Sequence, residues 1–199
     1  MVAGNAMRRS LNDKGGELNI DAGKGTINPV QFFCGTQNNV PAYSGKSDGS
    51  VGVADPHTGG HGVGFPDANC DAFTVPLRYD IHFPSCYDPA AALDDYKHNT
   101  VYPSSVGATN GQNCPKGWIH IPHIFIEVYW NTPKFASLWT PGQGKQPFVL
   151  AQGDPTGYGL HGDFVSLHLN HELTVFYFSG HPTNVPVRSP AGTNRHFKP

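Results

Sequence analysis

Hydrophobic and polar residues alternate most regularly over residues 75–83, which read Val-Pro-Leu-Arg-Tyr-Asp-Ile-His-Phe. Every odd-numbered position in this segment is apolar, and every even-numbered position is polar or proline. Because successive side chains of a β-strand point to opposite faces, this period predicts a strand with one buried face. We expect Val75, Leu77, Tyr79, Ile81 and Phe83 to face the core, and Arg78, Asp80 and His82 to lie on the opposite face.

Shorter patterns predict two further strands and one helical turn. Residues 119–130 have apolar residues at both odd- and even-numbered positions, with Glu127 as the polar exception, and this pattern predicts a strand covered on both faces. Residues 148–150 predict a third strand, and the alanine-rich residues 89–96 contain the only helical signal. Short strands joined by Gly- and Pro-rich loops predict a mainly β fold, either an antiparallel β-sandwich or a jelly roll.

Composition agrees with this fold class and argues against others. The 199 residues include 24 glycines and 18 prolines, which disfavours a helical bundle or coiled coil. The net charge of -2 argues against a nucleic-acid partner bound through a basic field. An aromatic content of 12% argues against disorder throughout the chain. No apolar run reaches the length of a membrane span, so we predict no membrane-spanning segment.

Histidine and carboxylate spacing suggests few metal sites. His120 and His123 would lie on opposite faces of a strand, so we predict two half-buried histidines and not a pair of metal ligands. The four cysteines form an even set without a Cys-x-x-Cys pair, which disfavours a zinc ribbon and suits two disulfides in a secreted protein. The requirement for a metal or cofactor stays open at this point.

The segment Gly153–Phe164 has the clearest chemical content, because it combines two carboxylates, a histidine, a tyrosine and four glycines. An extended His161-x-Asp163 sequence would point both side chains to one side, as an acid/base pair or two metal ligands require. Alternatively, the segment is a turn whose aspartates accept backbone N–H groups. The candidate catalytic residues are Asp154, Tyr158, His161 and Asp163. We expect Asp154, His161 and Asp163 to lie in one concave, solvent-reachable patch.

Several motifs resemble those of a known family. They are Phe83-Pro84-Ser85-Cys86, Cys114-Pro115, the segment 121–130 and the segment 153–164, in that order. The family is a fungal secreted domain of unknown function, catalogued as nineteen-ninety-six, that is often found beside WSC carbohydrate-binding modules. The resemblance covers residues 1–164 and implies a secreted, extracellular β-rich domain associated with cell walls and glycans.

The chain also departs from the family pattern. Two family histidines are replaced by Tyr96 and Asn99. The family's upstream portion and signal peptide have no counterpart, so the β domain of residues 1–164 looks truncated at both ends and incomplete. Residues 165–199 no longer follow the family, and we expect an atypical tail that is disordered or a gene-model artefact.

The family motifs also suggest how the cysteines pair. Cys86 and Cys114 lie near prolines at the edges of predicted strands, and both belong to family motifs. We therefore predict a disulfide between them. A second disulfide between Cys34 and Cys70 follows by elimination.

Three functional hypotheses follow from the sequence. The first is a secreted carbohydrate-active protein that acts on polysaccharide through the Asp/His residues of segment 153–164. The second is a non-catalytic glycan-binding or cell-wall structural module, in which Trp118, Trp130 and Trp139 stack on sugar rings. The third is an inactive, truncated gene product. Whether the protein is an enzyme, its substrate and its oligomeric state stay open.

Overall fold

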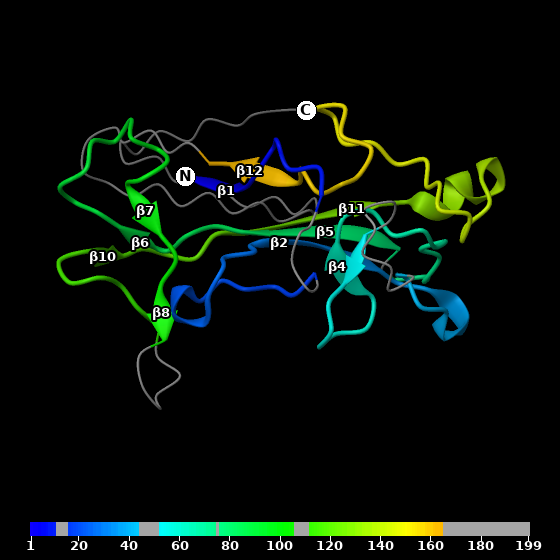
Figure 1. Ribbon diagram of the computed structural model, residues 1–199, viewed down its shortest axis with the longest axis horizontal. Helices are drawn as coiled ribbons and strands as arrows, with labels where there is room; N and C mark the ends of the chain where they lie inside the picture. Colours follow the sequence, from blue (N-terminus) through cyan, green and yellow to red (C-terminus); the bar gives the residue numbers. More distant parts are fainter. Residues whose placement is uncertain (11–15, 44–51, 75, 106–111, 165–199) are drawn as a thin grey trace, which may run out of the picture. The chain divides into compact units, whose positions relative to one another are not determined.

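A five-stranded antiparallel sheet, in the order β11-β5-β2-β4-β3, organises the fold (Figure 1). Its strands are β2 (Val30–Cys34), β3 (Val53–Ala54), β4 (His61–Val63), β5 (Leu77–His82) and β11 (Phe125–Trp130). The computed structural model describes residues 1–10, 16–43, 52–74, 76–105 and 112–164. All strand pairs in this part of the chain are antiparallel. The predicted mainly β, antiparallel fold is confirmed.

Strand β5 lies between β11 and β2 and follows most of the predicted alternation. Leu77, Ile81 and Phe83 are buried in the core, and Tyr79 packs against the same core while partly exposed. Val75 lies outside the described residues.

Asp80 lies on the other face of β5, and it is nevertheless only 5% exposed. Its flanking residues across the sheet are Gln31 on β2 and Glu127 on β11. The guanidinium of Arg78 also donates a 2.7 Å hydrogen bond to its carboxylate. Polar neighbours on the same face therefore cover Asp80 and keep it from solvent.

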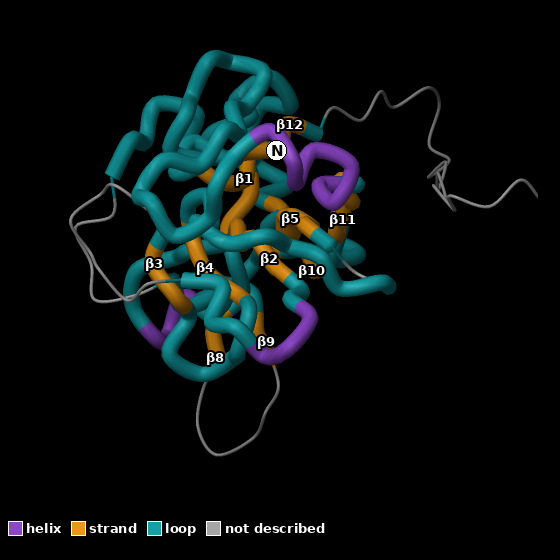
Figure 2. Tube along the Cα trace, turned by 90° about the vertical axis from the view of Figure 1, so that its right-hand side faces the viewer, coloured by secondary structure: helices purple, strands orange, loops and turns teal. Residues whose placement is uncertain are grey.

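Smaller sheets surround the five-stranded sheet. They consist of β1 (Val2–Gly4) with β12 (His161–Asp163), of β10 (Ile119–His120) with β6 (Cys86–Tyr87) and β7 (Thr100–Val101), and of β8 (Ser104–Ser105) with β9 (Gln112–Asn113). Three short 3-10 helices are also described: η1 (Ala22–Lys24), η2 (Gln37–Asn39) and η3 (Thr132–Leu138). Figure 2 shows the short strands separated by long loops.

The β1–β12 pair packs on the core face of the five-stranded sheet. A Cβ atom added to Gly162 would lie 3.0 Å from Phe83 and 3.2 Å from Ile81. A larger side chain would therefore push the two layers apart, so this close approach requires glycine. Ala3 of β1 belongs to the same buried cluster as Phe32 and Ile81 of the sheet, so part of the core lies between the two layers.

The prediction for residues 119–130 is wrong in two respects. The segment forms two strands, β10 and β11, which belong to different sheets. Strand β11 is an edge strand, and alternate side chains such as Phe125 and Tyr129 are exposed. Apolar residues on both faces therefore do not mark a buried strand here, because, among the residues that the structure describes, no further strand or layer covers the outer face of β11. His120 and His123 are likewise exposed and not half-buried.

Two other local predictions are also corrected. Residues 148–150 form no strand, because Phe148 packs its ring against Phe65 and the Leu150 amide donates to the carbonyl of Asp154. Residues 89–96 form turns and not a helix. In both segments, contacts within turns and loops replace the regular hydrogen bonds that the local pattern predicted.

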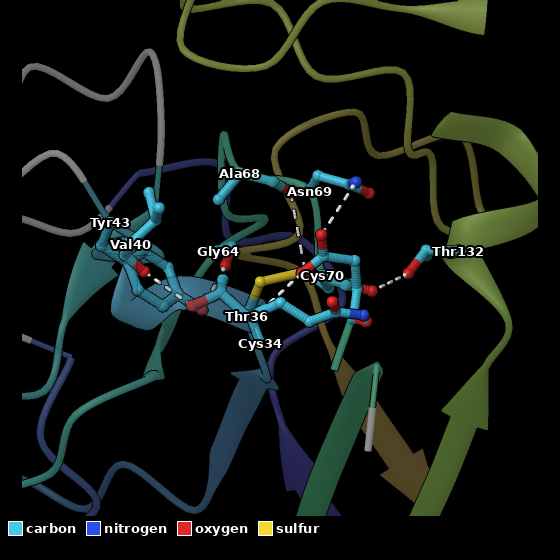
Figure 3. Close-up of a disulfide and its surroundings, with 11 residues drawn as sticks. Cys34, Thr36, Val40, Tyr43, Gly64, Ala68, Asn69, Cys70 and Thr132 are labelled. Atoms are coloured by element: carbon cyan, nitrogen blue, oxygen red, sulfur yellow. Dashed lines mark hydrogen bonds between the residues drawn. A yellow bond between two sulfur atoms is a disulfide. The ribbon is translucent and has the colours of Figure 1, made fainter. Parts of the chain in front are cut away.

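Both predicted disulfides are confirmed, and all four cysteines are paired. The Cys34–Cys70 bond joins the end of β2 to a distant loop (Figure 3). The hydroxyl of Thr132, the first residue of η3, donates to the carbonyl oxygen of Cys70 over 3.0 Å. This disulfide therefore also helps to position η3. The Cys86–Cys114 bond joins β6 to the segment that precedes β10.

Asp21 connects η1 to β8 and should make the stability of the domain depend on pH in the acid range. Its carboxylate accepts hydrogen bonds from the backbone N–H and the hydroxyl of Ser105, and from the Gly23 amide. These donors lower the pKa of Asp21 from 3.8 to about 2. The carboxyl group of Asp21 therefore binds a proton less tightly in the folded state than in the unfolded state. Its contribution to the stability of the fold is complete above about pH 4 and is lost as the pH falls towards 2.

We expect Asp21→Asn to reduce the difference between the unfolding free energies at pH 5 and pH 2, measured by urea denaturation. Asp94→Asn, at an exposed turn position, is the matched control and should keep the wild-type difference. An unchanged pH dependence in Asp21→Asn would show that these hydrogen bonds do not control acid stability.

Candidate functional site

The segment Gly153–Phe164 folds as a turn followed by β12, and Asp154 organises the turn. The Asp154 side chain is 0% exposed. One of its carboxylate oxygens accepts from the N–H and the hydroxyl of Thr156, at 2.8 and 2.6 Å, and the other accepts from the Gly159 N–H at 2.7 Å. Arg9 adds a cation 3.6 Å from the carboxylate. The local donors and this cation compensate the charge that burial removes from water.

Tyr158 is also buried, in a small cluster with Val53 and Val63. Asp154 therefore does not belong to a solvent-reachable patch, and this part of the expectation is wrong. The physical reason is that the turn directs both side chains into the domain, where hydrogen bonds and packing hold them. At Asp154, the alternative interpretation of a hydrogen-bonded turn describes the geometry.

His161 and Asp163 are brought together on one side of β12, as their spacing predicted. Gly162 between them faces the core, so both neighbouring side chains point away from it. The His161 Nε2 atom lies 4.0 Å from a carboxylate oxygen of Asp163. His161 Nδ1 lies 2.9 Å from the Gly159 carbonyl oxygen, which can only accept, so Nδ1 carries hydrogen. The pair is partly open to solvent.

Two of the three candidate tryptophans belong to one aromatic cluster. Trp130, at the end of β11, lies 6.2 Å from the ring of Phe65, and Phe65 lies 5.6 Å from Phe148. Trp139 meets Phe148 edge to face at 5.7 Å. Trp118 precedes β10, in the separate three-stranded sheet. The structure thus unites Trp130 and Trp139 through phenylalanines that the sequence analysis did not select.

An open pocket of about 200 Å³ lies beside this cluster, at the junction of β11 and η3. It is lined by Trp130, Asn131, Thr132, Phe135, Phe148 and Val149. Phe135 is 54% exposed, so its ring is available to a ligand. Sequence reasoning missed Phe135 and Phe148, because the pocket joins two segments that carry no common motif.

A second cluster that sequence reasoning missed lies on the outer face of the five-stranded sheet. Arg78 contacts Asp80 at 2.7 Å and Glu127 at 3.0 Å. Its guanidinium also lies over the rings of Phe33, at 5.3 Å, and Tyr129, at 5.9 Å. Burial raises the pKa of Asp80, although the hydrogen bond from Arg78 acts in the opposite direction. The register between neighbouring strands brings these charges together, and the residue pattern of one strand alone does not reveal that register.

The described residues contain no group of three or more His, Cys, Asp or Glu side chains that could hold a metal ion. In the same residues, no helix is long and apolar enough to cross a membrane.

The fold and these clusters define a disulfide-linked antiparallel β domain with an open aromatic pocket. The chain belongs to the family described as Domain of unknown function (DUF1996), whose family model matches residues 1–166. The resemblance noted in the sequence is therefore confirmed. No curated protein and no solved structure matches the chain.

Proposed function

We propose that this domain binds a carbohydrate chain, without cleaving it, in the pocket between β11 and η3. The observation that carries the proposal is the gathering of Trp130, Phe135 and Phe148 around one open pocket. Aromatic faces offer sugars a flat apolar surface, and a few polar groups fix the ligand's orientation. Asn131 at the pocket can supply such a group, because its amide both donates and accepts hydrogen bonds.

The chemistry of the pocket favours binding over catalysis. None of its six lining residues has a side chain that could transfer a proton near neutral pH. Asp154, a predicted catalytic carboxylate, is buried, and backbone and hydroxyl donors occupy both of its oxygens. A binding module fits these two observations better than a hydrolytic centre at Asp154.

An extracellular, cell-wall location is part of the same proposal. Both cysteine pairs are disulfides, and such bonds persist in oxidising compartments such as the extracellular space. A wall polysaccharide would then be the accessible ligand.

Phe135→Ala should weaken the binding of the protein to insoluble chitin or insoluble β-1,3-glucan about tenfold, which corresponds to about 1.4 kcal/mol for one aromatic contact. The ring is half exposed, so its removal should leave the melting temperature nearly unchanged. The measurement is a depletion isotherm on each polysaccharide.

Tyr96→Ala is the matched control, because Tyr96 is 52% exposed and lies outside the pocket lining. This variant should bind like the wild type. Equal affinities for all three proteins, or no binding by the wild type to either polysaccharide, would refute binding at this pocket.

The exposed His161 and Asp163 pair supports a second candidate function, an acid/base site acting on polysaccharide. The 4.0 Å separation and the partial exposure of both side chains favour it. Reducing-end release from the same polysaccharides separates the two functions. Activity that disappears in His161→Ala, with unchanged binding, would favour the enzyme.

A further inference from the structure

Two histidine rings meet at the end of β11 opposite Trp130. His82 is the last residue of β5, and its strand partner on β11 is Phe125. His123 belongs to the segment between β10 and β11. The His82 Nδ1 and His123 Nε2 atoms lie 3.3 Å apart, and the ring centres are 5.2 Å apart. This contact joins residues 41 positions apart in the chain.

The spacing of the two rings fits a shared metal ion. In a tetrahedral site with nitrogens at 2.0–2.1 Å from the metal, two ligating nitrogens lie about 3.3 Å apart and their ring centres about 5.2 Å apart. A straight N–H···N hydrogen bond of the same length would place the ring centres about 5.6 Å apart. The observed distances therefore fit two rings that converge on a common point, and they differ from those of a straight hydrogen bond.

The surroundings hold the two rings in position and leave them accessible. The ring of Phe125 stacks on His82 with centres 4.4 Å apart. The Tyr102 hydroxyl donates a 2.8 Å hydrogen bond to the carbonyl of His82, and the Phe83 amide donates to the carbonyl of Ile124. His123 itself is exposed, so an ion can reach the pair from solvent. Ligands held in place before binding lose less entropy when the ion arrives.

Both rings are suited to bind a metal at neutral pH. Burial, with a smaller contribution from the nearby His123, lowers the pKa of His82 to about 4. His123 is exposed as a whole, but the contact with neighbouring side chains removes part of its ring from water and so lowers its pKa as well. Metal ions bind the neutral form of imidazole, and a lowered pKa favours that form.

We propose that His82 and His123 form a two-histidine site for a divalent transition-metal ion, with water or an external ligand in the remaining positions. Imidazole ligands suit copper, nickel and zinc, and affinity for a given nitrogen site is highest for Cu²⁺. Only two protein ligands hold the ion, so the site is exchangeable and open to a further donor. The inference stands independently of glycan binding, because the pocket residues take no part in it.

Titration of the full chain with CuSO₄ at pH 7, followed by calorimetry and by electron paramagnetic resonance, tests the site. The wild type should bind one more equivalent of Cu²⁺ than His123→Ala, and this equivalent should show a two-nitrogen signal. His82→Asn should lose the same equivalent. Circular dichroism of each variant verifies that it is folded.

His98→Ala is the matched control, because His98 is a strongly exposed histidine that contacts only a carboxylate, Asp95, among the described contacts. The His98→Ala variant should still bind the equivalent of Cu²⁺ that His123→Ala no longer binds. An identical Cu²⁺ titration for wild type and folded His123→Ala would overturn the proposal and leave the pair as a hydrogen-bonded contact. Loss of the equivalent in His98→Ala but not in His123→Ala would overturn it as well.

Discussion

Leu77→Asp should destabilise the domain by about 4 kcal/mol or more, because it places a carboxylate in an apolar core without a partner. Leu77 is 0% exposed and belongs to the interior strand β5, where its cross-strand neighbours are Cys34 and Trp130. An aspartate there must either stay charged away from water or take up a proton. Either state costs folding free energy. Urea denaturation followed by tryptophan fluorescence measures the change.

Leu93→Asp is the matched control for this prediction. The substitution is chemically the same, but Leu93 is 73% exposed in a turn, so the new carboxylate stays in water. We expect a change within about 0.5 kcal/mol. If Leu77→Asp were as stable as Leu93→Asp, β5 would not have the register described here.

Asp154→Ala should cost about 3 kcal/mol, because it leaves one buried and two partly buried donors without an acceptor. The backbone N–H groups of Thr156 and Gly159 lose their partners, and so does the Thr156 hydroxyl. The turn that leads into β12 should loosen as a result. Thermal and urea unfolding measure the cost.

Asp163→Ala separates a structural from a chemical role within the same motif. Asp163 is largely exposed, and its described polar partner is His161 at 4.0 Å, so its removal should change stability by less than about 0.5 kcal/mol. A fully stable Asp154→Ala variant would contradict the structural role of Asp154. A comparable loss in both variants would mean that the whole motif acts as one structural unit.

Local sequence determined the features that depend on a repeating pattern or on a family motif. The buried positions of β5 follow from period two, because alternate side chains of any strand face opposite sides. The approach of His161 to Asp163 follows from the same geometry. The β class follows from frequent breakers and short apolar segments. Motifs shared with the family pointed to the Cys86–Cys114 pair.

Only the tertiary structure decided what covers each of these segments. Asp80 is buried because β2, β11 and Arg78 surround it, and Asp154 is buried because its turn folds inwards. Strand β11 is exposed on one face because no described segment covers its outer side, although its sequence resembles that of a covered strand. A pattern along the chain reports which side chains share a face, but burial depends on segments that are distant in sequence.

The same reason explains the candidate sites. The aromatic pocket combines residues of β11, η3 and the segment near Phe148, and the histidine pair combines β5 with the segment before β11. Trp130 could be selected from sequence because tryptophan is a common sugar-stacking residue, but its pocket partners could not. The chemistry of each residue could therefore be judged from the sequence. Which of these residues lie close together depended on the strand register, which brings separate segments into contact.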